Sequence, residues 1–347
     1  MAAAADALPG VSYVMPVLNE ALYIEIAIAT VLAQNYEGAK ELILALGPST
    51  DDTDAIVRRL ADADPRITTV QNPEIDIPVG LNLAIRASKY PIIVRVDAHS
   101  ELEPGYTSRA VQTLERTRAA NVGGIMHARG KTPFQSAAAR GYNSRFGLGG
   151  ARYHSSGEEG PAESAYLGVF RREVLEEVGY FDESIRRGED WELNLRIRAA
   201  GHTVWFDPEL RVTYWPRESW NRLARQFCAT GIWRGELVRR YRGRNPWRFF
   251  VAPLLVLNVF VSLVLAVLQV TGVVSGWPSA LASVVYLGPL AYVLLVLGLA
   301  FTADRGTRPL ERWFFVVVLP TMHLSWGVGF IVGVLRGARD SVDTSRA

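Results

Sequence analysis

A carboxylate and an imidazole follow a short apolar run in the first third of the chain. The run Pro91–Val96 is typical of a buried β-strand, and Asp97 and His99 come directly after it. Because side chains at positions i and i+2 of an extended segment point to the same side, these two can bind one ligand together. Oxygen and nitrogen ligands suit a divalent cation, and a cation held there could bind a diphosphate. Taken alone, the pattern also fits a strand that ends in a polar turn.

The elements that must position these residues alternate between strands and helices. Four apolar runs predict strands, and these are Val11–Val17, Glu41–Leu46, Ile67–Val70 and Ile92–Val96. The segments between them predict helices, and these are Glu20–Ala33, Thr53–Ala61 and Val79–Ala87. Such alternation indicates right-handed βαβ units and a mostly parallel sheet, which is an α/β fold.

Ligands of such a sheet bind beyond the carboxyl ends of its strands. Asn19 and Glu20 follow the first predicted strand, Asp51 follows the second, and Asp97 and His99 follow the fourth. We therefore expect these polar side chains to lie at one edge of the sheet. Their common position favours the metal-binding interpretation over the polar turn.

A second group of carboxylates opens a helix later in the chain. Glu189 and Asp190 precede a predicted helix at Trp191–Ala200. Taken alone, acidic residues in a first helical turn indicate a cap. A carboxylate in that position tends to have a lowered pKa, so we expect Asp190 to be ionised.

Composition and missing motifs exclude several classes of protein. The net charge of +2 argues against a nucleic-acid partner. Neither GxGxxG nor a P-loop follows the predicted strands, and the sequence has no HExxH or CxxC motif for zinc. The single cysteine, Cys228, rules out an intramolecular disulfide. Met1–Gly10 lacks the features of a signal peptide, so we expect the chain to start in the cytoplasm.

Three long apolar runs occupy the last hundred residues: Phe249–Val274, Pro278–Ala303 and Trp313–Leu335. The first two carry no charge and exceed the roughly 20 residues needed to cross a bilayer, whereas buried core helices rarely stay uncharged for so long. We expect a multi-pass protein of the plasma (inner) membrane. A second interpretation, a transporter or channel subunit, is disfavoured because His323 is the only ionisable side chain in these runs.

Arginines predict the orientation of the runs. Clusters precede the first run and follow the second, at Arg234, Arg239, Arg240, Arg242, Arg244 and Arg248, and at Arg305, Arg308 and Arg312. The positive-inside rule places both clusters, and the amino-terminal half, in the cytoplasm. Three full crossings would leave the tail outside, although it carries Arg336, Arg339 and Arg346. Either the rule is weakly violated, or the segment around Pro320 is re-entrant.

The stretch before the first run combines tryptophans with arginines. An amphipathic helix at Trp220–Tyr241 would lie along the membrane face, and an ordinary surface helix is the alternative. The predicted organisation is therefore a cytoplasmic domain at residues 1–215, an amphipathic membrane-interface segment at 216–248, a helical transmembrane region of about three spans at 249–336, and a tail at 337–347.

Four motifs resemble a known enzyme family in order and spacing over roughly residues 10–240. They are Val14–Glu20, Ser49–Thr53, Val96–His99 and Arg187–Glu192. Together they resemble the family 2 glycosyltransferases of GT-A fold. Asp-Ala-His at 97–99, in place of the usual Asp-x-Asp, resembles the ExoA-like subgroup of succinoglycan glucosyltransferases.

The resemblance implies inverting transfer of a sugar from a nucleoside-diphosphate sugar, with a UDP-sugar favoured and a GDP-sugar possible. It implies that Asp97 and His99 bind a divalent cation, Mn²⁺ or Mg²⁺, and that Asp190 is the catalytic base. The membrane segments imply a lipid-linked acceptor in cell-envelope polysaccharide or glycolipid synthesis, and we expect this acceptor to be polyprenyl-linked. The residues expected to bind the donor are Pro16, Asn19, Glu20, Leu46, Asp51, Asn82, Asp97, Glu189, Gln226, Trp233 and Arg234.

Two departures from the family pattern qualify these expectations. Leu46 stands where the family usually has an aspartate that contacts the nucleobase. Gln226, Trp233 and Arg234 only partly match the Gln-x-x-Arg-Trp motif of processive synthases, which favours transfer of a single sugar. These three either close over the diphosphate or lie at the membrane surface. The alternative function is a non-catalytic membrane scaffold built on a glycosyltransferase-like domain.

Overall fold

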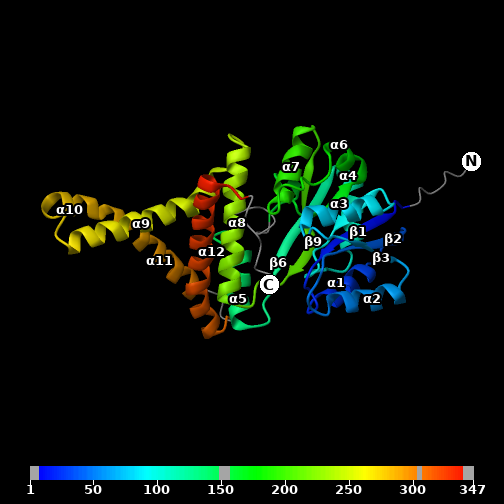
Figure 1. Cartoon of the computed structure of the whole chain (residues 1–347), viewed down its shortest axis with the longest axis horizontal. Helices are drawn as coiled ribbons and strands as arrows, with labels where there is room; N and C mark the ends of the chain where they lie inside the picture. Colours follow the sequence, from blue (N-terminus) through cyan, green and yellow to red (C-terminus); the bar gives the residue numbers. More distant parts are fainter. Residues whose placement is uncertain (1–7, 148–156, 303–306, 339–347) are drawn as a thin grey trace, which may run out of the picture. The chain divides into compact units, whose positions relative to one another are not determined.

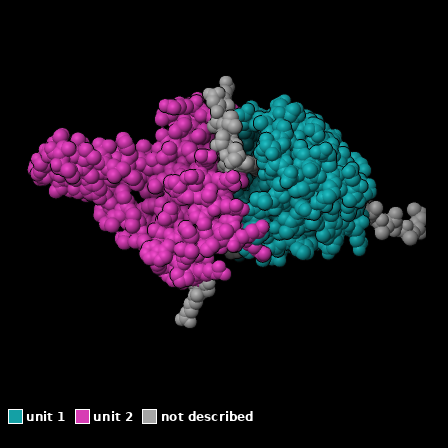
Figure 2. Space-filling model, turned by 60° about the horizontal axis from the view of Figure 1, so that its bottom comes forward, with its two compact units in different colours: residues 1–128, 150–215 teal, residues 129–149, 216–347 magenta. Residues whose placement is uncertain are grey.

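The computed structural model describes residues 8–147, 157–302 and 307–338, and these form two compact units (Figures 1 and 2). The sheet unit comprises Met1–Ala128 and Gly150–Trp215, and the helical unit comprises Arg129–Gly149 and Pro216–Ala347. One break between the two units falls between Trp215 and Pro216, and the predicted domain organisation stays a prediction. Arg305, Arg339, Arg346 and most of the predicted tail lie outside the described residues.

The described part of the sheet unit contains one mixed sheet (Figure 1). Its strands are β1 (Val11–Val17), β2 (Lys40–Leu46), β3 (Ile67–Gln71), β4 (Ile92–Arg95), β5 (Ser100–Leu102), β6 (Asn121–Ala128), β7 (Gly160–Pro161), β8 (Tyr166–Arg171) and β9 (Val204–Tyr214). Their order is β3-β2-β1-β4-β8-β6-β9-β5, and β7 pairs with β9. The four predicted strands pair in parallel, as expected. β8 lies antiparallel between β4 and β6, and this strand was not predicted from the sequence.

Helices cover both faces of this sheet. They are α1 (Ile24–Leu32), α2 (Thr53–Ala63), α3 (Ile77–Ala87), α4 (Tyr106–Thr117), α6 (Arg172–Val178) and α7 (Glu189–Ala199). Alternate side chains of β1 enter different clusters: Tyr13 and Met15 pack with Val57 of α2, and Val14 packs with Leu81 of α3. A strand buried on both faces reads as a continuous apolar run, which is why β1 was recognisable. The α/β fold class is confirmed.

The helical unit begins with a segment that lies in the first domain of the predicted organisation. This segment contains α5 (Pro133–Asn143). The remaining helices are α8 (Trp220–Arg240), η2 (Trp247–Phe250), α9 (Val251–Val270), α10 (Gly276–Ala282), η3 (Ser283–Tyr286), α11 (Leu287–Phe301) and α12 (Pro309–Arg336). Within the described residues, three stretches are long and apolar enough to cross a membrane, namely Trp247–Val270, Ser279–Phe301 and Pro309–Arg336.

Glycines let α8 and α12 pack closely side by side (Figure 1). A methyl group at Gly333 would lie 2.0 Å from the Ile232 carbonyl oxygen, and one at Gly329 would lie 2.1 Å from that of Cys228. Gly231 of α8 meets the backbone of α12 in the same way. Because higher-numbered residues of α8 meet higher-numbered residues of α12, the two helices run parallel. Small residues allow such contact between helix backbones.

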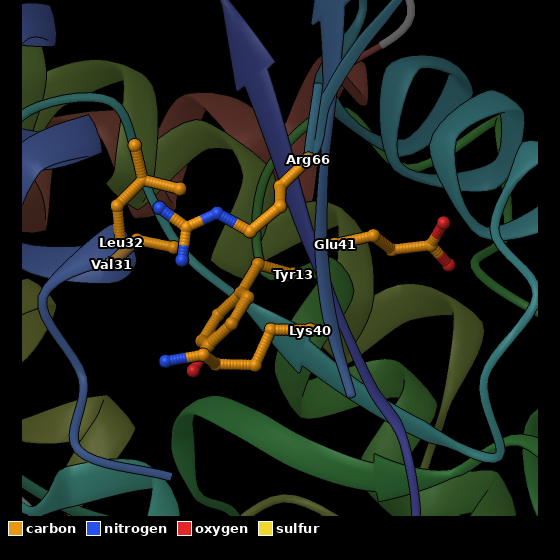
Figure 3. Close-up of a pocket in the computed structure, with 6 residues that line it drawn as sticks. All are labelled: Tyr13, Val31, Leu32, Lys40, Glu41 and Arg66. Atoms are coloured by element: carbon orange, nitrogen blue, oxygen red, sulfur yellow. The ribbon is translucent and has the colours of Figure 1, made fainter. Parts of the chain in front are cut away.

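A shallow hollow that is open to solvent lies at the amino-terminal edge of the sheet (Figure 3). Its lining consists of Tyr13, Val31, Leu32, Lys40, Glu41 and Arg66. The Glu41 carboxylate points away from the hollow and accepts a hydrogen bond from the Ser12 hydroxyl at 2.6 Å (Figure 3). Ligands of parallel sheets bind at the opposite, carboxyl-terminal edge. The hollow is therefore not the candidate site.

Candidate active site

The loops after β1 and β2 are joined by polar side chains. Asn19 adopts a left-handed backbone conformation (φ 54°), and its Oδ1 accepts a hydrogen bond from the Thr50 N–H at 2.8 Å. Asp51 accepts hydrogen bonds from the N–H groups of Ala21 (3.2 Å) and Thr53 (3.1 Å). Burial raises the pKa of Asp51, but hydrogen bonds from Thr53 and Ala21 outweigh it and lower the pKa below its usual value. Asn19 and Asp51 thus shape the edge, and their contact with a donor stays a prediction.

His99 is held by a carboxylate from the first loop. The Nδ1 atom of His99 lies 3.0 Å from Oε1 of Glu20, and both side chains are buried. The His99 ring also makes an edge contact with Tyr214. If neutral His99 donates its Nδ1–H to Glu20, the lone pair of Nε2 is presented to a ligand, which is the usual arrangement for a metal-binding histidine.

Three carboxylates converge on one buried cation, Arg95 at the end of β4. Its Nη1 donates to Asp190, while its Nη2 donates to Glu189 at 3.0 Å and to Asp97 at 3.3 Å. The guanidinium also lies 5.8 Å from the centroid of the Phe181 ring. Burial lowers the pKa of Arg95, but the three carboxylates raise it above its usual value, so the guanidinium stays charged. The structure thereby brings together the predicted base and a predicted metal ligand.

Gly188 sets the direction in which Glu189 and Asp190 enter the site. It adopts a left-handed conformation (φ 79°) immediately before α7, which glycine tolerates best. The expected lowering of the Asp190 pKa is wrong. Burial raises this pKa to about 8, and the nearby carboxylates Glu189 and Asp97 add to the rise, although Arg95 opposes it. Burial and the neighbouring negative charges therefore raise the Asp190 pKa by more than the amino terminus of α7 lowers it.

Arg95 was not among the residues predicted from the sequence. The signal was present, because an arginine inside the apolar run Pro91–Val96 must find partners when its strand is buried. The sequence alone could not name those partners, since Glu189 and Asp190 come more than ninety residues later.

Other predicted donor residues occupy different surroundings. Pro16 pairs with Ala45 in the sheet, and the buried side chain of Leu46 belongs to the hydrophobic core. Asn82 is buried in α3, where its side chain bonds both the N–H and the carbonyl oxygen of Phe181. These contacts suit a structural role, and donor contacts of Pro16, Leu46 and Asn82 stay predictions.

The last three predicted donor residues lie on α8 of the helical unit. Trp233 is buried, Gln226 accepts a hydrogen bond from the Tyr142 hydroxyl at 3.3 Å, and the Arg234 guanidinium lies 4.3 Å from the centroid of the Phe249 ring. Each has a role inside its own unit, and donor contact for all three stays a prediction.

The acidic residues fit a divalent cation. When Asp190 is ionised, Asp97, Glu189 and Asp190 together carry three negative charges against the single positive charge of Arg95, and these four side chains then have a net charge of −2. Among the described residues, no three His, Cys, Asp or Glu side chains form a complete ligand set. Two protein ligands completed by phosphate oxygens are what Mg²⁺ commonly uses. Asp97 and His99 could supply those two.

Comparisons with known proteins identify the family. The sequence model of glycosyl transferase family 2 matches residues 12–179. The succinoglycan biosynthesis protein ExoA of Rhizobium meliloti (strain 1021) is 30% identical over 323 residues, which cover 91% of this chain and 92% of that protein. The chain belongs to glycosyltransferase family 2. Its similarity to ExoA extends beyond the matched domain and into the helical unit.

Two further proteins resemble this glycosyltransferase. A dolichyl N-acetyl-alpha-D-glucosaminyl phosphate 3-beta-D-2,3-diacetamido-2,3-dideoxy-beta-D-glucuronosyltransferase of Methanococcus voltae is 22% identical over 248 residues, 69% of this chain and 77% of that protein. The solved structure of the mannosyltransferase PcManGT from Pyrobaculum calidifontis superposes with a TM-score of 0.61 at 19% identity, covering 95% of this chain and 90% of that one. The latter likeness concerns the fold, which is GT-A with a helical carboxyl-terminal region.

Proposed function

We propose that this glycosyltransferase moves one sugar, with inversion, from a nucleoside-diphosphate sugar to a lipid-linked acceptor in cell-envelope polysaccharide or glycolipid synthesis. The observation that carries the proposal is the convergence of Asp97, Glu189 and Asp190 on Arg95 at the carboxyl edge of the sheet. PcManGT was solved in complex with GDP-Man and Mn²⁺, which supports a nucleotide-sugar donor and a divalent cation for this chain. A UDP-sugar remains our favoured donor, with a GDP-sugar as the alternative.

The reaction requires a base and a counter-charge on opposite sides of the sugar. Asp190, once ionised, accepts the proton of the acceptor hydroxyl while the hydroxyl oxygen forms a bond to the anomeric carbon of the sugar. The bond from that carbon to the diphosphate breaks, and the diphosphate leaves with the electron pair. A divalent cation bound by Asp97 and His99 would neutralise the charge on the departing diphosphate. Glu20 fixes the ring of His99, and Arg95 fixes the carboxylate of Asp190.

We further propose that only two of the three apolar stretches cross the membrane. In the most apolar 18-residue part of each stretch, 11% of the residues are buried in Trp247–Val270 and in Ser279–Phe301, but 39% are buried in Pro309–Arg336. One side of α12 packs along α5 and α8. Those helices carry Arg140, Arg222, Arg225, Arg234, Glu236, Arg239 and Arg240, and charged side chains rarely enter hydrocarbon. A helix with such neighbours along its length suits the interface better than the bilayer core.

The exposed apolar side chains of α12 support an in-plane position. They are Leu310, Trp313, Val317, Val328, Val334 and Leu335. The spacing of all except Val334 places them on one face of the helix, away from the buried face that includes Phe315 and Met322. Such a helix lies with one face in the headgroup region. The hairpin formed by α9 and α11 would then provide the two crossings.

Two crossings also remove the conflict with the positive-inside rule. The arginines before α9, those after α11 and those of the tail would all lie on the cytoplasmic side, together with the sheet unit. We expect a green fluorescent protein fused after residue 347 to fluoresce, and alkaline phosphatase at the same position to be inactive. Fusions in the loop at residues 272–275 should behave in the opposite way. An active phosphatase at the carboxyl terminus would instead indicate a third crossing.

The proposed function is tested with membranes that contain the full-length protein. Labelled UDP- and GDP-sugars are added with polyprenyl phosphate or polyprenyl-linked sugar acceptors, and label in the lipid extract is measured. We expect label from one donor in the presence of Mn²⁺ or Mg²⁺, and its loss when a chelator is added. Folded protein that neither transfers nor hydrolyses any donor would favour the non-catalytic scaffold.

A further inference from the structure

Arg95 is the positively charged side chain that Asp97, Glu189 and Asp190 share. Arg95 is 5% exposed, and its two terminal nitrogens bond Asp97, Glu189 and Asp190. Its Nε is buried and has no hydrogen-bond partner among the described residues. Buried donors normally have a hydrogen-bond partner, so a position that leaves Nε without one is not the position that satisfies the guanidinium best. This indicates that the carboxylates determine where Arg95 lies.

The three contacts of Arg95 are unequal. Its Nη2 is shared between Glu189 at 3.0 Å and Asp97 at 3.3 Å, whereas Nη1 bonds Asp190 alone. The Asp97 contact is the longer of the two on the shared nitrogen, and hydrogen bonds weaken with length. Asp97 is also more exposed than Glu189, at 17% against 8%. Of the two carboxylates that share Nη2, Asp97 is therefore the one that Arg95 can release more easily to another cation.

We propose that Arg95 is a positioning residue that holds Asp190 and Glu189 permanently and shares Asp97 with the incoming divalent cation. This inference rests on the proposed function and concerns the order of binding at the same site. Arg95 balances part of the acidic charge in the unloaded protein, so the cation alone binds weakly. A donor diphosphate brings its own negative charge and favours the cation, which makes cation and donor binding cooperative.

The test measures cation binding without donor, so that it does not depend on turnover. Mn²⁺ is titrated into the purified full-length protein and the free ion is followed by electron paramagnetic resonance. We expect Arg95→Gln to bind Mn²⁺ at least about tenfold more tightly than the natural protein, because one positive charge has left a poorly screened site. The same variant should lose most of its kcat, because Asp190 is no longer fixed. Unchanged or weaker Mn²⁺ binding in Arg95→Gln overturns the proposal.

A second substitution identifies the shared carboxylate. In an Asp97→Asn background, adding Arg95→Gln should tighten Mn²⁺ binding much less, because only the change in charge remains and the released ligand is absent. If the gain is as large without Asp97 as with it, the shared-ligand account is wrong. Arg66→Gln is the matched control, since Arg66 pairs with Asp64 at the other edge of the sheet and should leave Mn²⁺ affinity unchanged.

Two outcomes separate this inference from the proposed function. Cation-dependent transfer together with unchanged Mn²⁺ affinity in Arg95→Gln refutes the role of Arg95 and leaves the proposed function intact. Absence of transfer with every donor and cation refutes the proposed function. If Arg95→Gln does not fold, the titration is done with Arg95→Lys. A single lysine ammonium cannot reproduce the two guanidinium nitrogens that bond the three carboxylates. Arg95→Lys should also bind Mn²⁺ more tightly, by severalfold, and no change would again overturn the proposal.

Discussion

Replacing Asp190 with asparagine is expected to lower kcat by about 10²- to 10⁴-fold, which is the usual contribution of a positioned general base. Asparagine keeps the size of the side chain and cannot accept the proton of the acceptor hydroxyl. Its amide oxygen still accepts a hydrogen bond from Arg95, so donor binding should change little. Transfer is measured with the lipid extract assay, and donor affinity with isothermal titration calorimetry.

Asp64→Asn is the control for this variant, because Asp64 lies outside the site and pairs with Arg66. It should retain full activity. If Asp190→Asn kept more than about a tenth of the natural kcat, Asp190 would not be the base. Intact cellular function in Asp190→Asn would favour the scaffold interpretation instead.

The pH dependence of the natural enzyme adds a second signature of Asp190. Burial is the largest cause of the raised Asp190 pKa of about 8. The positive charge of Arg95 on β4 lowers this pKa, and the negative charges of Glu189 and Asp97 raise it. A base works only when ionised, so kcat/KM, which reports the free enzyme, should fall as the pH is lowered through about 8. The kcat of the loaded enzyme should fall only at lower pH, because a bound cation favours the ionised form. The Asp190→Asn variant should lose both transitions.

Replacing Gly333 with alanine is expected to disrupt the helical unit. The added methyl carbon would lie 2.0 Å from the Ile232 carbonyl oxygen, and backbone on both sides prevents a side chain from moving out of the way. The two helices must separate, and overpacking of this kind costs about 1–3 kcal/mol or more. We expect a thermal midpoint roughly 2–12 °C lower, measured on detergent-solubilised protein.

Gly298→Ala is the matched control for Gly333→Ala. It introduces the same methyl group into α11, where nothing lies within 4 Å of the added carbon. Alanine also favours helix over glycine, so this variant should be as stable as the natural protein or slightly more stable. Equal thermal midpoints for the two variants would show that close contact between α8 and α12 is not needed for stability.

Much of the sheet unit could be predicted from the sequence, because its central strands are buried on both faces. Apolar runs such as Ile92–Val94 of β4 indicate the parallel half of the sheet. The antiparallel insertion of β8 depends on pairing with distant segments, and no local pattern specifies which strands are its neighbours. For the same reason, the grouping of α5 with the helical unit could not be read from residues 129–149.

The candidate site was predicted in part. Asp97 and Asp190 were named as metal ligand and base, and the structure brings both to Arg95. The sequence could not yield the direction of the Asp190 pKa shift, because burial and neighbouring charges are properties of the folded chain. The Glu20–His99 contact also joins two loops that are far apart in the sequence. Both residues were named as candidates, but their partnership was visible only in three dimensions.

The parallel pairing of α8 with α12 restricts the order in which the protein can be completed. The ribosome synthesises α8 before the membrane hairpin, and α5 earlier still, yet both pack against α12. In the proposed topology, the glycine-lined face of α8 therefore stays uncovered while α9 and α11 enter the bilayer. Contacts between segments so far apart in the sequence form slowly, and exposed apolar surfaces invite aggregation meanwhile. Emergence of α12 is thus the step that ends this vulnerable period of biogenesis.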